Sequence, residues 1–193
     1  MNLNRSNCIS SLKNNTIEEY FGIKIQELAL VNKINLRIDP ENNEYMSRCG
    51  KILNALLPLK PNTYTKNNNL KIMWLGPDEW LLSNEDNDDL LIKIKDEMDD
   101  LEASVTDVSE NRTIIRISGE KIYTLLSKFL VLDLEKNLSN ESSCAQTLFV
   151  KVPILIARNH KNNQEPQIDI FANRSHSNYI YNLIVDGTKN LDF

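Results

Sequence analysis

Apolar residues change their spacing along the first third of the chain in a way that predicts a strand followed by a helix. Across 28–38, apolar and polar residues roughly alternate, which is typical of a half-buried strand. Asp39 can cap a following helix and Pro40 suits its first position, and apolar residues then recur at helical spacing. Pro58 ends this predicted helix, and the polar segment 60–69 predicts a loop.

The stretch "WLGPDEWLL", Trp74–Leu82, contains both tryptophans of the chain and lies across two strand signals. Segments 70–75 and 79–83 predict a hairpin with the turn Gly76-Pro77-Asp78, because proline presets the backbone for such a turn. The acidic segment 86–102 follows and places its apolar residues on one helical face. Its acidic side is typical of a solvated surface.

Similar signals recur in the second half of the chain. Segment 104–118 predicts two short strands or one bent strand, with a break at 109–111. Segment 119–130 predicts the next helix. The second half therefore begins, like the first, with strand signals followed by a helix.

The C-terminal third predicts a hairpin and a final helix. Segment 145–158 reads as a strand interrupted at Pro153, which we expect at an edge or a bend because proline cannot donate a ladder hydrogen bond. Segment 167–173 alternates and pairs with it as a hairpin. Ser175 can cap the last helix, and Gly187 can end it.

This order of elements predicts an α+β fold made of two pseudo-repeated split β-α-β units with antiparallel or mixed sheets. We expect one domain over 25–188, with halves at about 25–110 and 111–188. Segment 1–24 is polar and is expected to be a mobile N-terminal tail, and 189–193 a C-terminal tail.

Composition excludes several classes of function. The formal net charge of −5 argues against unassisted binding of nucleic acid, which needs a basic footprint. No apolar run has the length of a membrane span, and the polar N-terminus does not resemble a secretory signal, so we expect a cytoplasmic protein. The three cysteines (Cys8, Cys49 and Cys144) form no C-x-x-C pair, which disfavours a zinc knuckle or a disulfide framework.

Motifs of catalysis and cofactor binding are sparse. Neither glycine-rich phosphate-binding motif occurs, and no G-x-S-x-G nucleophile elbow is present. The histidines, His160 and His176, have no second histidine or cysteine at ligand spacing. We therefore expect no catalytic, cofactor-binding or metal-binding residue in this chain. Cys144 could be a reactive thiol, but a small buried residue is the favoured interpretation.

Two groups of charged residues allow alternative interpretations. Asp78 and Glu79 could act as paired carboxylates, but side chains of a turn normally point into water, and general acid chemistry needs a shifted pKa. A structural hairpin turn flanked by the two tryptophans is favoured, and we expect Trp80 in the core. Asp107 and Arg112 could meet across a bend, or Asp107 could bind freed backbone amides.

Four stretches together resemble the gamma subunit of heterotetrameric sarcosine oxidase. They are "LGPDEWLL", "TDVSENRTIIRISG", "LDLEKNLSNESSCAQTL" and "IDIFANRSHSNYIYNLI", and they span most of 25–186 in the family's order. Within them, the residues that match the family's motifs are Gly76, Pro77, Asp78, Trp80, Asp107, Arg112, Gly119, Cys144, Gln146 and Arg174. Phe129-Leu130 departs from the family, since many relatives have a glycine-cysteine pair there.

The resemblance implies a fold akin to the folate-binding module of the glycine-cleavage T-protein and other aminomethyltransferases. It also implies a non-catalytic subunit, partnered by alpha, beta and delta subunits, with no nucleic acid or membrane involved. The complex is expected to oxidise sarcosine to glycine with formation of hydrogen peroxide and 5,10-methylenetetrahydrofolate. FAD, FMN, NAD, zinc and tetrahydrofolate are expected in the other subunits.

Two alternatives remain open at the level of sequence. One is the equivalent subunit of an N-methylglutamate dehydrogenase-type complex, because substrate contacts would lie in another chain. The other is a stand-alone tetrahydrofolate-dependent one-carbon transferase or demethylase, for which Glu79 or Asp107 would have to face a pterin. A shared fold does not by itself confer that function.

Overall fold

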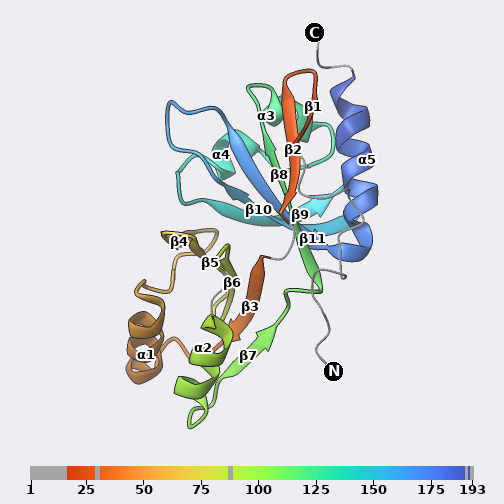
Figure 1. The fold of residues 1–193 in the computed structure, drawn as a ribbon. Coiled ribbons are helices and arrows are strands. Elements are labelled where there is room, and N and C mark those ends of the chain that lie inside the picture. Colours follow the sequence, from red (N-terminus) through yellow and green to blue (C-terminus); the bar gives the residue numbers. More distant parts are fainter. Residues whose placement is uncertain (1–16, 29–30, 87–88, 190, 192–193) are drawn as a thin grey trace, which may run out of the picture. The chain divides into compact units, whose positions relative to one another are not determined.

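The computed structural model describes residues 17–28, 31–86, 89–189 and 191. The described residues divide into two compact units (Figure 1): those up to 28 and those from 110 onward belong to unit 1, and those between 31 and 109 belong to unit 2. Each unit has a sheet, helices and its own hydrophobic core. The predicted α+β class is confirmed, and the strand pairs of both sheets are antiparallel rather than mixed.

Unit 2 is built on a five-stranded sheet with the order β4-β5-β6-β3-β7. Its elements are β3 (Asn32–Arg37), α1 (Asn43–Leu53), β4 (Tyr64–Asn67), β5 (Leu70–Gly76), β6 (Glu79–Asn84), α2 (Leu90–Met98) and β7 (Ser104–Asp107). Strand β6 lies between β3 and β5 and is antiparallel to both. The segment β3-α1-β5 is therefore a split β-α-β unit, as the sequence predicts.

One face of this sheet forms the core of unit 2. Leu36 lies opposite Trp80, and Ile34 lies opposite Leu82, which in turn pairs with Ile72 on β5. Because residues opposite each other on neighbouring strands share a face, these side chains form one apolar layer. Helices α1 and α2 add buried residues to the same cluster, among them Cys49, Leu53, Leu90, Ile94 and Met98.

Helix α1 begins later and ends earlier than the sequence predicts. Its cap is Asn42 rather than Asp39, because the Asn42 side chain accepts hydrogen bonds from two amides of the first turn. The Asp39 carboxylate instead accepts from the amide two residues later, at 2.9 Å. The helix ends at Leu53, because Asn54 adopts a left-handed conformation with φ of 47°. Pro58 therefore does not define its end.

Unit 1 contains a six-stranded sheet with the order β1-β2-β8-β11-β10-β9. Its elements are β1 (Glu18–Tyr20), β2 (Ile23–Leu28), β8 (Arg112–Ser118), α3 (Ile122–Ser127), α4 (Leu134–Asn137), β9 (Cys144–Phe149), β10 (Val152–Arg158), β11 (Gln167–Asn173), the 3-10 helix η2 (Arg174–His176) and α5 (Ser177–Thr188). Strand β11 lies between β8 and β10, which gives the second split β-α-β unit.

Isoleucine rows hold the core of unit 1 together. Ile117 lies between Ile25 and Ile168 across three strands, and Ile170 lies between Ile115 and Ile156. Helices α3, α4 and α5 bury apolar residues in the same cluster, including Ile122, Leu125, Leu126, Leu134, Ile180 and Ile184. Burying a residue of this size contributes about 1.5–3 kcal/mol, so these rows supply much of the stability of the unit.

The N-terminal segment departs from the expected mobile tail. Strand β2 pairs with β8, and Ile23 is fully buried, so the part of 1–24 that the structure describes belongs to the sheet of unit 1. Residues 1–16 lie outside the described residues. The units also differ from the halves expected at 25–110 and 111–188, because β2 belongs with the C-terminal strands. Of the expected tail 189–193, residues 190, 192 and 193 lie outside the described residues, and Leu191 is buried.

Three local predictions in the C-terminal third need correction. Ser175 does not cap α5, because a 3-10 turn precedes the helix and His176 occupies the cap position. Gly187 lies inside α5 rather than at its end, and a Cβ there would come within 2.7 Å of the Phe129 ring. Pro153 lies in β10, an internal strand, but at a position before the β11 ladder begins at Ile154. No ladder bond to β11 is lost there.

Two short elements have no clear signal in the sequence. Strand β4 lies within the segment 60–69 that predicts a loop, and helix α4 has a single turn. Asp133 caps α4 by accepting a hydrogen bond from the amide of Lys136 at 3.1 Å. Both elements are too short for a periodic pattern of apolar residues to develop.

Candidate functional site

The "GPDEWLL" stretch forms the hairpin between β5 and β6. Gly76 pairs with Glu79, so Pro77 and Asp78 form a two-residue turn. The backbone carbonyl of Asp78 accepts a hydrogen bond from the amide of Ile38 at 3.2 Å, which ties the turn to the end of β3. The motif therefore holds three strand ends of unit 2 in register.

Both carboxylates of this turn have structural partners. Arg37 donates from Nη2 to Oδ2 of Asp78 at 2.8 Å, and Asn35 donates from Nδ2 to Oε1 of Glu79 at 2.7 Å. The hydrogen bond from Arg37 lowers the pKa of Asp78, which favours the charged form. A general acid at neutral pH needs the opposite shift. The geometry supports the turn interpretation over paired catalytic carboxylates.

Trp80 lies in the core of unit 2, as we expected. Its side chain is 0% exposed, and its indole Nε1 donates to the carbonyl of Pro58 at 2.8 Å. Trp74 is its cross-strand partner and is half-buried. The hydrogen bond fixes the loop after α1 against the sheet, so the tryptophan joins two segments that are distant in sequence.

Asp107 and Arg112 belong to different units. Oδ1 of Asp107 accepts from the amide of Ser109 at 2.9 Å, so the carboxylate stabilises the turn after β7, in agreement with one of the two sequence interpretations. Ser109 in turn accepts from the amide of Lys33 at 2.9 Å through its hydroxyl oxygen. Arg112 begins β8 in unit 1 and pairs with Asn173 in β11.

Other motif residues of unit 1 also have structural surroundings. Gly119 has φ of 141° and lies so close to the β1–β2 turn that a Cβ would be 2.4 Å from the carbonyl oxygen of Gly22. Cys144 is fully buried in β9. Arg174 donates from Nη1 to Oε2 of Glu110 at 2.9 Å, and its buried Nε has no hydrogen-bond partner among the residues that the structure describes.

Unit 1 contains a small hollow where two motif residues meet. Arg112 and Gln146 line it together with Pro153, Leu155 and Phe171, among others, and its volume is about 110 Å³. Leu155 and Phe171 are buried, whereas Gln146 and Pro153 are exposed. The hollow therefore has an apolar floor and a partly polar rim, which suits a side chain better than a large cofactor.

Unit 2 has a larger, open hollow of about 670 Å³ beside the hairpin turn. Its lining includes Arg37, Asp39, Asp78 and Glu102. Because Arg37 and Asp78 are paired with each other, the remaining charge is carboxylate. The hollow has no arrangement of nucleophile and base among these residues.

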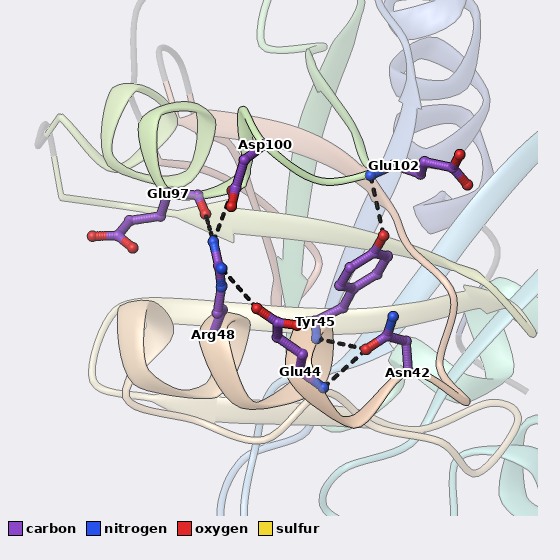
Figure 2. A network of polar contacts seen from close by, with 7 residues as sticks. All are labelled: Asn42, Glu44, Tyr45, Arg48, Glu97, Asp100 and Glu102. Atoms are coloured by element: carbon purple, nitrogen blue, oxygen red, sulfur yellow. Dashed lines mark hydrogen bonds and ion pairs between the residues drawn. The ribbon is translucent and has the colours of Figure 1, made fainter.

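A polar network next to this hollow fixes α1 against the segment after α2 (Figure 2). Arg48 donates to Asp100 and to Glu44, each at 2.7 Å, and also to the carbonyl of Glu97 at 3.2 Å. The hydroxyl of Tyr45 accepts from the amide of Glu102 at 3.2 Å. The hydrogen bond that Arg48 donates to Asp100, followed by the one that it donates to Glu44, raises the pKa of Arg48. These contacts position helices and do not assemble a reaction centre.

The sequence interpretation missed a buried ion pair in unit 1. Arg116 donates from Nε to Oδ1 of Asp169 at 2.7 Å and from Nη2 to Oδ2 at 3.1 Å. The two residues are cross-strand partners on β8 and β11, and Asp169 is 2% exposed. A signal was available, because Arg116 lies between two isoleucines in β8 and Asp169 lies between two isoleucines in β11. Buried carboxylates need such a partner.

The cysteine and histidine side chains that could carry nucleophilic or metal chemistry have structural surroundings. Burial raises the pKa of the Cys49 thiol to about 11, which keeps it protonated at neutral pH. Nδ1 of His160 accepts from the amide of Gln167 at 3.0 Å and so stabilises the β10–β11 loop. Among the described residues, no group of three or more His, Cys, Asp or Glu side chains could hold a metal ion. In the same part of the chain, no helix is long and apolar enough to cross a membrane.

Comparisons of the sequence with a family model and with individual proteins point to the same family. A model described as "Sarcosine oxidase, gamma subunit family" matches residues 15–190. Sarcosine oxidase subunit gamma of Corynebacterium sp. strain U-96 is 24% identical over 136 residues, which is 70% of this chain and 66% of that protein. Its counterpart from strain P-1 is 22% identical over 137 residues, which is 70% of this chain and 67% of that protein. The matched segment spans about two thirds of these relatives.

Solved structures share the fold. Heterotetrameric sarcosine oxidase from Corynebacterium sp. U-96, in complex with pyrrole 2-carboxylate, matches 92% of this chain and 89% of the other with a TM-score of 0.81 and 20% identity. Aminomethyltransferase T of the glycine cleavage system from Bartonella henselae matches 83% of this chain and 45% of its own chain, with a TM-score of 0.60 and 14% identity. The expected relation to the aminomethyltransferase fold is thereby confirmed. Since the family model matches nearly the whole length described, the chain belongs to the sarcosine oxidase gamma subunit family.

Proposed function

We propose that this chain acts as a non-catalytic subunit of a heterotetrameric sarcosine oxidase, assembled with alpha, beta and delta subunits. The family match over residues 15–190 carries this proposal, and the TM-score of 0.81 to a chain of such a complex supports it. The complex would oxidise sarcosine to glycine, with formation of hydrogen peroxide and 5,10-methylenetetrahydrofolate. The contribution of this chain is then a stable scaffold and a docking surface.

The way in which the chain uses its polar residues supports this role. The motif carboxylates Asp78 and Asp107 bind an arginine and a backbone amide, respectively, within unit 2. FAD, FMN, NAD, zinc and tetrahydrofolate would accordingly be held by the other subunits, and the sequence contains neither glycine-rich phosphate-binding motif. Free cysteines at Cys49 and Cys144 fit a reducing compartment such as the cytoplasm.

Co-expression tests the proposal directly. The full chain carrying an affinity tag is produced together with the alpha, beta and delta subunits encoded in the same organism, and in parallel without them. We expect the tagged chain to purify with all three partners, and the purified assembly to form hydrogen peroxide from sarcosine. Partners that remain soluble and active but never purify with the chain would contradict the proposal.

Two further measurements separate the alternatives. Titration of the purified chain with tetrahydrofolate should show no saturable binding at micromolar concentration. Micromolar binding would instead favour the stand-alone one-carbon enzyme. Replacing sarcosine by N-methylglutamate in the assay of the purified complex distinguishes the two types of complex, because the preferred substrate has the larger kcat/KM.

A further inference from the structure

The small hollow of unit 1 lies on the sheet face that points away from the helices. Phe171 pairs with Leu155, and Leu155 pairs with Gln146, so these three side chains share a face. Asn173 follows Phe171 by two residues and pairs with Arg112, which places both on the same face. All five line the hollow, and none belongs to the apolar cluster that α3, α4 and α5 join. The sheet therefore carries its helices on one face and this hollow on the other.

The lining of the hollow is positive and otherwise uncharged. Among the described residues that line it, Arg112 carries a charge and none is Asp or Glu. The whole chain has a net charge of −5, so a cavity with a guanidinium and no carboxylate differs from the rest of the molecule. Arg112 and Asn173 are half-buried on one side, and Gln146 is exposed on the other. Guanidinium and amide N–H groups are donors, and together they suit an anionic acceptor.

The size and the floor of the hollow narrow the class of anion. Its volume of about 110 Å³ corresponds to about four water molecules, and so to a ligand of about four to six non-hydrogen atoms. Nucleotides, flavins and pterins are much larger. The floor consists of the buried side chains of Leu155 and Phe171, and burying a phosphate against apolar groups is costly. A short carboxylate has its charge at one end and can lay its aliphatic part on that floor.

The polar side chains can reach such a ligand from two sides. Arg112 also interacts elsewhere within the protein, but a guanidinium has several N–H donors and holds a carboxylate with only part of them. Asn173 is its cross-strand neighbour and adds an amide donor beside it. Strands β11 and β9 are two strand spacings apart, about 10 Å, so Asn173 and Gln146 face the same few atoms from opposite sides.

We propose that this hollow binds a small aliphatic monocarboxylate of about three or four carbon atoms. The carboxylate accepts hydrogen bonds from Arg112 and Asn173, the aliphatic part packs on Leu155 and Phe171, and Gln146 lies at the mouth. The proposal does not depend on the proposed function. Co-expression with the other subunits tests that function, and neither result changes the other.

The test is an NMR titration of the isotope-labelled, full-length chain with propionate as the probe. We expect saturable shifts in the signals of Arg112, Gln146, Phe171 and Asn173, with a Kd on the order of 1–10 mM for so small a ligand. Propionamide has a similar shape and no charge, so it should bind at least about tenfold more weakly. Inorganic phosphate should also bind more weakly than propionate. Either compound binding as tightly as propionate, saturation that shifts other residues instead, or no saturable shift overturns the proposal.

Two substitutions test the residues that would hold the carboxylate. Gln146→Glu places a negative charge at the mouth on an exposed residue, so the fold is kept and propionate should bind at least about tenfold more weakly. Arg112→Gln removes the guanidinium and should abolish the saturable shifts. Where Arg112→Gln does not fold, Gln146→Glu decides the outcome.

Gln164→Glu is the matched control. Gln164 is exposed in the loop between β10 and β11, at the far end of β10 from Pro153. This variant should bind propionate within about twofold of the wild type, because the added charge is distant from the hollow. Equal weakening by Gln164→Glu and Gln146→Glu, or unchanged binding by Gln146→Glu, overturns the assignment to this hollow.

Discussion

Replacing Gly119 by alanine tests whether the close approach of β8 to the β1–β2 turn is essential for unit 1. Gly119 has φ of 141°, a conformation that alanine rarely adopts. A Cβ would lie 2.4 Å from the carbonyl oxygen of Gly22 and 3.1 Å from Cδ1 of Ile23. The nearest obstacle is backbone, so no side-chain rotation can relieve the contact. Either the turn or the end of β8 must move.

The magnitude follows from these two effects. A strained backbone conformation costs about 1–3 kcal/mol, and overpacking a well-packed site costs about 1–3 kcal/mol. We therefore expect Gly119→Ala to lower the free energy of unfolding by about 2–6 kcal/mol. Gly50→Ala is the matched control. Gly50 lies inside α1, where the nearest atom to a Cβ is the carbonyl oxygen of Ala55 at 3.8 Å, so the change should stabilise by about 0.5–1 kcal/mol.

Urea unfolding monitored in parallel by far-ultraviolet circular dichroism and tryptophan fluorescence measures both effects. Both tryptophans lie in unit 2, whereas circular dichroism reports both units. Gly119→Ala should shift the circular dichroism transition to lower urea, and Gly50→Ala should shift the fluorescence transition to higher urea. A Gly119→Ala chain as stable as the wild type would refute the argument from close backbone approach.

Three further changes test the cores and the ion pair. Trp80→Ala should destabilise unit 2 by about 3–5 kcal/mol in urea unfolding, because it leaves a cavity and removes the donor to the carbonyl of Pro58. A loss of less than about 1 kcal/mol would contradict the burial of the indole. Asp169→Asn should cost about 3–5 kcal/mol, because it removes the buried carboxylate charge that accepts two hydrogen bonds from Arg116. Asp169→Asn combined with Arg116→Met should recover part of that loss in the same assay. Burial raises the pKa of the Cys49 thiol from 9.0 to about 11 on folding, so the unfolded chain loses this proton at lower pH and the free energy of unfolding falls as pH rises between these values. Cys49→Ala should remove that part of the pH dependence. Identical pH profiles for the variant and the wild type would refute the shift.

Local patterns predicted the hairpins better than they predicted the ends of helices. The β5–β6 hairpin follows from alternation interrupted by proline and aspartate, and both signals act within a few residues. The predicted cap of α1, Asp39, was wrong because aspartate and asparagine are both good caps. The sequence does not show whether Asp39 or Asn42 directly precedes the first turn of the helix. Cap choice depends on where β3 ends, which its pairing with β6 determines.

The candidate site was predictable in part. The structural role of the Asp78 turn follows from turn chemistry alone, and the core position of Trp80 follows from its place on one arm of a hairpin. The meeting of Arg112 and Gln146 in one hollow was not predictable, because β8 and β9 are brought together through β10 and β11. For the Arg116–Asp169 pair, the sequence shows a charge between isoleucines in each strand, but it does not show that these strands are neighbours, since the two residues are 53 positions apart.

The sequence by itself determined the α+β class, the two split β-α-β units and the family motifs, because these depend on periodicity and short-range turn chemistry. Tertiary structure alone decided that the N-terminal strand β2 completes the sheet of the C-terminal unit, next to β8. Strand order depends on the burial of whole sheet faces and on backbone hydrogen bonds between distant segments. No local pattern of residues encodes which distant strand will form those hydrogen bonds.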